Sequence, residues 1–137
     1  MTALDDLDAR LEASAEQLPE DTFTPVYPDL PGWIEAVFAP TFARRTTAAF
    51  RWCGQWWQHP EAIVRLEALW RTWESLHLDP VMGMATWLRD HLDPQLAKLT
   101  AHDGPFAECA PGSHHPQPRL STTPPPSTWW PTTEEFS

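Results

Sequence analysis

The chain has 137 residues, a formal net charge of −10 and a hydrophobic fraction of 42%. This length suits a single domain, and the composition excludes both a fully disordered polymer and a membrane protein. The two ends carry nearly all of the charge, with eight acids against one base in residues 1–30. Because non-specific binding to nucleic acid depends on Lys and Arg neutralising phosphates, nucleic acid is disfavoured as a partner.

No apolar run approaches the roughly 20 residues that cross a bilayer, and the first residues are acidic where a secretory signal is basic and then apolar. We therefore expect a cytoplasmic protein that makes no contact with membranes. The only cysteines, Cys53 and Cys109, lie 56 positions apart, a separation that matches neither a disulfide framework nor a zinc-ligand spacing. We expect two reduced thiols, and the sequence predicts no metal site and no cofactor.

Residues 1–30 are expected to form an acidic helix followed by a linker. Leu4, Leu7 and Leu11 recur at helical spacing and predict an amphipathic helix near the start of the chain. Such a short helix is not stable alone, so it must dock on its own domain, on another protein or on a second copy. Three prolines between positions 19 and 28 then forbid a continuous helix.

Residues 31–106 carry the strongest helical periodicity in the chain. The spacing predicts a short helix that Pro40 interrupts, a longer helix over 41–58 and a central helix over 60–77. After a turn, a last helical run contains Pro94, which either kinks it or starts a new helix. No stretch has the alternating pattern of a strand, so we expect an all-α domain, a small bundle of three to five short helices.

Tryptophan dominates this predicted domain, which holds seven of the nine in the chain. Aromatic rings at these positions could stack against bases or sugars, but most of them fall in register with aliphatic residues, which favours burial. We expect Trp52 or Trp56 to be the most exposed of the seven. The predicted core contains Trp33, Phe50, Trp57, Ile63, Leu66, Trp70, Trp73 and Trp87.

Residues 107–137 are expected to form a disordered tail, because they contain seven prolines and few apolar residues. Two histidines in it, His114 and His115, should lie in solvent. At the tip, aromatic and acidic residues return together, which suggests a docking peptide whose rings enter a groove while its acids meet a basic rim. The candidate partner-binding residues there are Trp129, Trp130, Glu134, Glu135 and Phe136.

Four ordered motifs resemble one protein family. They are RWCGQWWQHPEA at 51–62, RLEALWRTWE at 65–74, GMATWLRDHLD at 83–93 and DGPF at 103–106. Together they are similar to the actinobacterial family named domain of unknown function four-nine-one-three. The resemblance implies relatives in actinobacterial genomes, phages and conjugative or integrative elements. It implies no activity, cofactor or catalytic residue.

Asp90, His91 and Asp93 suggest a metal or acid–base site, because imidazole and carboxylate groups bind metals and carry protons. The two aspartates share a helix face, but His91 points about 100° away, so convergence needs help from His59 or His77. His91 also lies on the apolar stripe of its helix, which favours a structural role. The candidate polar site consists of His59, Asp90, His91 and Asp93. They would be the functional residues if the protein is a small enzyme.

The favoured interpretation is a non-enzymatic protein-interaction or accessory module of an actinobacterial phage or mobile element. Its partner is either another protein or a second copy, bound through the N-terminal helix or the tail. One alternative is the enzyme or metal site above. The other is a nucleic-acid accessory factor, which an exposed patch formed by Arg44, Arg45 and Arg51 would favour.

Overall fold

The computed structural model describes residues 24–130. Within that range the fold is all-α, as predicted: no strand forms among these residues, only two isolated bridges. The predicted N-terminal stripe of Leu4, Leu7 and Leu11 lies outside the described residues. So do Glu134, Glu135 and Phe136 at the tip of the tail.

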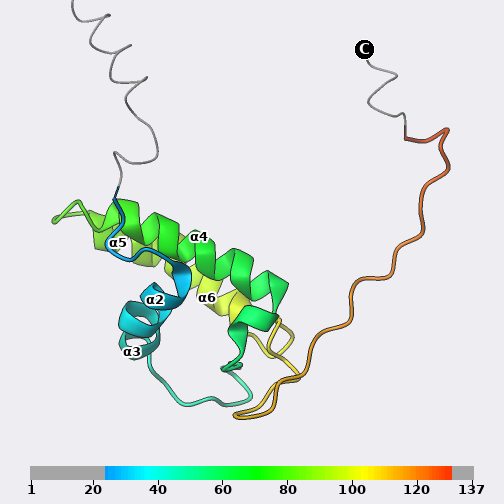
Figure 1. Ribbon diagram of the computed structural model, residues 1–137, viewed down its shortest axis with the longest axis horizontal. Helices are drawn as coiled ribbons and strands as arrows, with labels where there is room; N and C mark the ends of the chain where they lie inside the picture. Colours follow the sequence, from blue (N-terminus) through cyan, green and yellow to red (C-terminus); the bar gives the residue numbers. More distant parts are fainter. Residues whose placement is uncertain (1–23, 131–137) are drawn as a thin grey trace, which may run out of the picture.

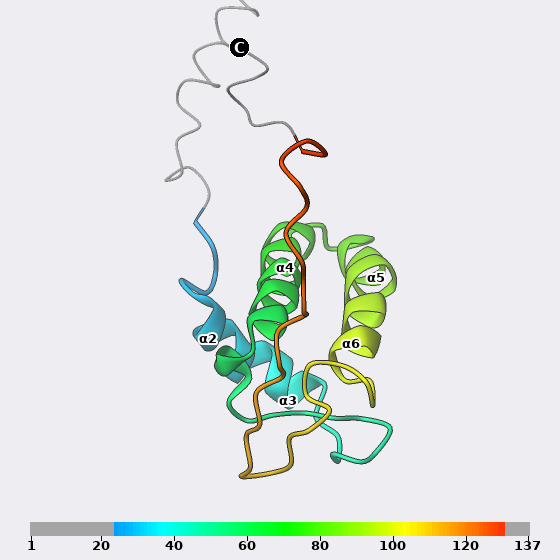
Figure 2. The ribbon, with the colours of Figure 1, turned by 90° about the vertical axis from the view of Figure 1, so that its right-hand side faces the viewer.

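Two helical segments lie side by side and antiparallel, and a third crosses them (Figures 1 and 2). The first is α4 (Pro60–Leu76). The second is a continuous run of α5 (Gly83–Trp87), the π-turn η4 (Leu88–Leu92) and α6 (Asp93–Leu99). The crossing segment consists of α2 (Leu30–Trp33), the π-turn η2 (Ile34–Phe38) and α3 (Ala39–Thr41).

A proline follows each π-turn closely. Pro40 comes two residues after η2, and Pro94 two residues after η4. A proline within a helix lacks the N–H donor, and its ring collides with the carbonyl four residues earlier. A wider turn relieves that collision, since each π-turn closes with an i to i+5 bond, Ala39 N–H to Ile34 O and Asp93 N–H to Leu88 O. Each helical run therefore continues through its proline.

The predicted helix over 41–58 is wrong. The chain leaves helical structure after Thr41 and runs irregularly until the short 3₁₀ helix η3 (Trp56–Gln58). Apolar residues recur in this segment at helical spacing, yet they are brought to the core by a loop, and Phe50 and Trp52 pack against it from there. The β-branched residues Thr46 and Thr47 favour this outcome, because their side chains lose rotamer freedom in a helix.

The core is built around Trp33 and Trp87, both fully buried. The Trp33 ring lies 5.7 Å from Phe38, 6.1 Å from Trp73 and 6.2 Å from Trp87, measured between centroids. The indole N–H of Trp87 donates to the Leu69 carbonyl at 3.0 Å. Leu66 is fully buried too, while the other predicted core residues Phe50, Ile63, Trp70 and Trp73 are partly buried and pack against the core.

The predictions for the tryptophans at 56 and 57 are corrected by the structure. Trp57 was placed in the core, but its side chain is 57% exposed. Trp56, a candidate for exposure, is buried. Both lie in the 3₁₀ helix η3, whose tighter turn points adjacent residues to different sides than the α-helical spacing predicts.

A buried carboxylate attaches the start of the domain to α4. Glu74 is only 2% exposed. Its carboxylate accepts hydrogen bonds from the backbone N–H of Val26 at 2.9 Å, the N–H of Tyr27 at 3.0 Å and the indole N–H of Trp70 at 3.2 Å. Three donors compensate for removing the charge from water.

The turn between the two antiparallel helical segments requires glycine at position 83. A Cβ atom built there would lie 1.8 Å from the Leu76 carbonyl oxygen, so the end of α4 and the start of α5 meet closely. Among residues 24–130, no helix combines the length and the apolar character needed to cross a membrane.

Glu74→Ala is expected to lower the free energy of unfolding by about 2 kcal/mol, since it leaves three partly buried N–H donors without their acceptor. Urea unfolding followed by tryptophan fluorescence measures this change. The control is Glu67→Ala, because Glu67 makes a surface pair with Arg71 and its loss should cost less than about 0.5 kcal/mol. Equal costs for the two substitutions would show that the Glu74 hydrogen bonds do not hold the start of the domain.

Candidate metal centre

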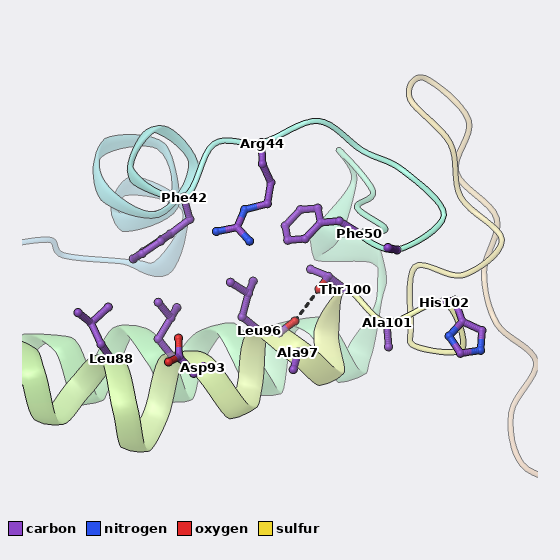
Figure 3. Close-up of a pocket in the computed structure, with 12 residues that line it drawn as sticks. Phe42, Arg44, Phe50, Leu88, Asp93, Leu96, Ala97, Thr100, Ala101 and His102 are labelled. Atoms are coloured by element: carbon purple, nitrogen blue, oxygen red, sulfur yellow. Dashed lines mark hydrogen bonds between the residues drawn. The ribbon is translucent and has the colours of Figure 1, made fainter.

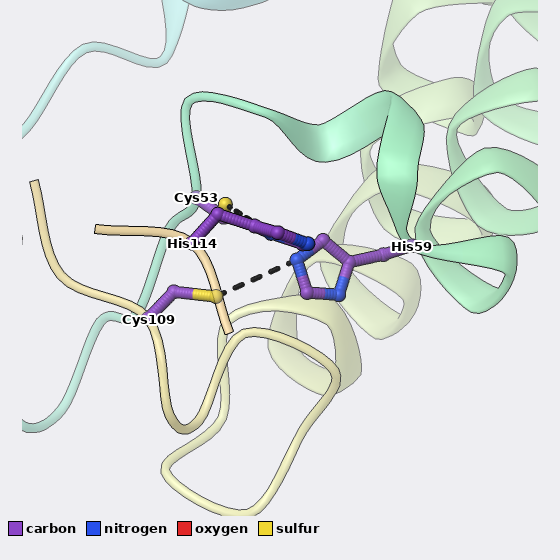
Figure 4. Close-up of side chains that lie close together, drawn as sticks. All are labelled: Cys53, His59, Cys109 and His114. Atoms are coloured by element: carbon purple, nitrogen blue, oxygen red, sulfur yellow. Dashed lines mark hydrogen bonds between the residues drawn. The ribbon is translucent and has the colours of Figure 1, made fainter. Parts of the chain in front are cut away.

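Four side chains with metal-binding atoms converge at the N-terminal end of α4 (Figure 4). Cys53 comes from the loop before η3, His59 directly precedes α4, and Cys109 and His114 follow α6. One ligand atom of each residue lies within 4.8 Å of the others. Among the residues that the structure describes, this is the only group of three or more such side chains.

The separations within the cluster match tetrahedral coordination. Zn–S bonds of about 2.3 Å and Zn–N bonds of about 2.05 Å at a tetrahedral angle place S and N about 3.6 Å apart. The Cys109 Sγ lies 3.5 Å from His59 Nε2, and the Cys53 Sγ lies 3.3 Å from His114 Nδ1. A small adjustment of side chains is sufficient to surround an ion.

His59 is fixed in place by the residues around it. Its backbone is extended at the N-cap position of α4, and Pro60 occupies the first helical position, where a missing N–H costs nothing. The imidazole is 3% exposed and meets the Phe106 ring edge to face, with centroids 5.0 Å apart. A buried, packed imidazole presents its nitrogen in one direction.

A tight turn returns the chain so that His114 lies beside Cys109. Ala110 and Ser113 exchange two backbone hydrogen bonds of 2.9 and 2.8 Å around Pro111 and Gly112. Gly112 has a φ of 75°, a conformation that glycine adopts without strain. Proline followed by glycine at the centre of a turn is the usual sequence of a type II turn.

The surroundings of Cys53 and His59 favour the neutral form of each side chain. Burial raises the pKa of the Cys53 thiol, and the neighbouring Cys109 raises it further, against a lowering hydrogen bond from the Gln55 backbone. Burial also lowers the pKa of His59, as does the charge of His114. The imidazole is therefore ready to bind a cation, and a bound divalent ion would favour the thiolate form of the cysteines.

Both backbone groups of His115 lie beside the sulfur of Cys109. The His115 N–H donates toward this sulfur at 3.4 Å, and the His115 carbonyl oxygen accepts from the thiol at 3.4 Å. The Arg51 guanidinium donates to the Cys109 carbonyl oxygen, and the Arg51 N–H donates to Thr100 O at 2.8 Å. Groups that hold metal ligands in position commonly make such bonds.

Two thiolates and two imidazoles form a donor set typical of tetrahedral zinc. Four protein ligands also complete the coordination shell. A catalytic zinc site keeps one position for water or substrate, whereas a structural site is closed. The chemistry that this arrangement supports best is the structural binding of one zinc ion.

The cysteine spacing alone predicts no metal site, whereas the structure brings both cysteines together with two histidines. The prediction compared the two cysteines only with each other, although each has a histidine close by in sequence. His59 is six positions after Cys53 and His114 is five positions after Cys109, with turn-forming glycines between them. Two short Cys–His pairs are the signal that could have identified the site.

The expectation that residues from 107 onward are disordered is wrong for the first part of that segment. Cys109 is fully buried and His114 is partly buried, with its ring centroid 4.6 Å from that of His59. The packed part of the chain thus extends past residue 106. From residue 116 to 130 every side chain is exposed.

The candidate polar site is not assembled in the structure. His59 belongs to the cysteine cluster, whereas no metal-capable group among the described residues contains Asp90, His91 or Asp93. Asp90 instead pairs with Arg89 at 2.8 Å. That ion pair is exposed and lowers the pKa of the Asp90 carboxyl, chiefly through the side-chain hydrogen bond.

The three arginines of the nucleic-acid alternative do not form one exposed patch. Arg44 and Arg45 are exposed. Arg51 is partly buried, its Nε atom is enclosed, and its guanidinium is used to hold the Cys109 carbonyl. Two exposed arginines remain, so the observation that would favour this alternative is missing.

The comparison with known proteins identifies a family but no characterised relative. The sequence model of the family described as Domain of unknown function (DUF4913) matches residues 27–130. Since the match spans more than half of the chain, the protein belongs to this family. The matched range includes all four residues of the cluster. No curated protein and no solved structure matches the chain.

The metal-free protein is expected to lose stability as the pH falls below 6.5, the usual pKa of histidine. Because burial lowers the pKa of His59 in the folded state, the unfolded chain takes up a proton before the folded chain does, which favours unfolding in that window. Urea unfolding in a chelator at about pH 7.5 and about pH 5.5 measures the loss. The His59→Gln variant should lose less unfolding free energy between the two pH values than the exposed control His102→Gln. Identical losses in the two variants would contradict the assignment of this pH dependence to His59.

Proposed function

We propose that this member of the DUF4913 family binds one structural zinc ion through Cys53, His59, Cys109 and His114, and serves as a non-enzymatic protein-interaction domain. The observation that carries the proposal is the convergence of four ligand atoms within 4.8 Å of one another. The cluster joins two short segments, 53–59 and 109–114, that are far apart in sequence. Such convergence of two thiols and two imidazoles in a small domain is typical of a structural zinc site.

The ion would stabilise a domain whose core is small. It connects the loop before η3, the start of α4 and the segment after α6, so it closes a long loop that contains both antiparallel helical segments. Small domains bury a limited fraction of their surface and often depend on a metal or disulfides. The irregular segment over 42–55 has no helix to hold it, and the metal would fix its end.

A closed site argues against catalysis at the metal. With two sulfur and two nitrogen ligands, no position remains for a substrate. The acidic and histidine residues outside the cluster are dispersed, which also favours a non-enzymatic role. Exposed aromatic residues favour interaction with another chain, since Trp129 and Trp130 are 77% and 75% exposed.

The cellular setting that we propose is the cytoplasm, where reduced thiols are available to bind a metal. The resemblance of the four motifs to an actinobacterial family favours an accessory role in a phage or in a conjugative or integrative element. In such elements an interaction domain without its own chemistry would connect other proteins.

Full-length protein purified without a metal-affinity tag is expected to contain about one zinc per chain, as measured by inductively coupled plasma mass spectrometry. Cys109→Ser and His114→Ala should each lower the zinc content and the melting temperature. The matched control is His115→Ala, since its side chain is exposed and lies outside the cluster. Full zinc content in the Cys109→Ser and His114→Ala variants, or none in the wild type, would refute the proposal.

A further inference from the structure

A groove lies between the irregular segment after α3 and the run from η4 to α6 (Figure 3). Its volume is about 730 Å³, within the usual range of binding pockets. Phe42 and Phe50 form one wall, and Leu88, Leu92 and Leu96 form the opposite wall. The side chains of both walls are apolar, polar residues lie between the walls, and the lining includes none of the four residues of the metal centre.

One cation at this groove has no carboxylate partner among the described residues. Arg44 projects into the space between the two walls (Figure 3), with its guanidinium 4.9 Å from the centre of the Phe50 ring. None of the ion pairs among residues 24–130 includes it. Arg45, the next residue, is exposed as well. Asp93, Thr100 and His102 are the other polar residues of the lining.

The tip of the tail has chemistry complementary to this groove. Trp129 and Trp130 leave most of their aromatic surface in water, and a hydrogen bond of 2.9 Å from Trp129 N–H to Pro126 O forms a turn there. In sequence, Glu134 and Glu135 follow closely. The rings of Trp129 and Trp130 can pack against the apolar side chains of the walls and stack on the Arg44 guanidinium. The two glutamates can pair with the charge of the same arginine.

The spacer before the tip favours a groove on another molecule. It contains Pro116, Pro118 and three consecutive prolines at 124–126, which stiffen the chain in an extended conformation. Figure 1 shows the tail leaving the domain instead of folding back across it. About a dozen residues in this conformation span roughly 40 Å, enough to reach a neighbouring copy.

We propose that the tip around Trp129 and Trp130 of one copy docks in the groove of a second copy, with Arg44 of that copy meeting Glu134 and Glu135. Each chain has one tip and one groove, so two copies exchange tails reciprocally and close a symmetric dimer. The contact does not require the zinc ion to touch the tail. It assigns one partner, a second copy, to the proposed interaction domain.

The test is the mass of the full-length protein by light scattering over a dilution series, with circular dichroism and zinc content recorded for each variant. The wild type is expected to be dimeric at high concentration. Trp129→Ala/Trp130→Ala should raise the Kd at least about 30-fold, the effect of truncating strong interface tryptophans. Leu120→Ala is the matched tail control, because Leu120 is exposed but lies outside the tip.

The groove is tested by Leu88→Glu, which places a charge on a lining residue that is partly exposed. It should weaken the dimer as the tryptophan variant does. Its control is Val64→Glu, since Val64 is an exposed helical residue outside the groove. Mixing the tip variant with the groove variant should restore heterodimers, because one intact tip and one intact groove remain. Arg44→Glu combined with Glu134→Lys/Glu135→Lys should recover affinity that either change alone reduces.

Several results would overturn the proposal. One is a wild type that stays monomeric at all concentrations, including a monomer in which the tip docks in its own groove. A second is a dimer that persists in the folded tryptophan variant and disappears when residues 1–20 are removed, which would assign the contact to the N-terminal segment. Failure of the mixed variants to form heterodimers would exclude exchange of tails.

Discussion

The convergence of two cysteines and two histidines at the start of α4 is the constraint on which this account depends. It joins the irregular loop, the first residue before the central helix and the turn after α6. Each ligand is held by its surroundings: His59 by Pro60 and Phe106, and His114 by the turn at Gly112. A metal bound there would connect segments that the helices do not connect.

The rest of the fold provides a rigid frame for that convergence. The antiparallel pair of α4 with the run from α5 to α6 packs on Trp33 and Trp87, and Glu74 attaches the start of the domain to the same frame. Prolines in two helical segments are accommodated by π-turns without ending them. The groove beside α6 and the four-residue cluster share no residue, so the proposed partner contact and the proposed metal site can be tested separately.

The spacing of apolar residues predicted the regular helices correctly. It failed where tertiary contacts determine the local conformation. The central helix and the all-α class follow from a strong periodicity and from prolines at helix starts. The segment over 41–58 has similar spacing, yet its rings reach the core from a loop, because packing and not helix formation satisfies Phe50 and Trp52. The cluster was missed since its members come from two separate segments, and the number of residues between the cysteines says nothing about folded proximity. Considering each cysteine with its nearest histidine would have indicated the site, but not that the two pairs meet.

X-ray absorption at the zinc edge, measured on the full-length protein as purified, tests the central claim most directly. The account predicts a first shell of two sulfur atoms at about 2.3 Å and two nitrogen atoms at about 2.0 Å, with no further light-atom ligand. A shell without sulfur, or one with a single sulfur atom, would contradict a closed site formed by Cys53, His59, Cys109 and His114.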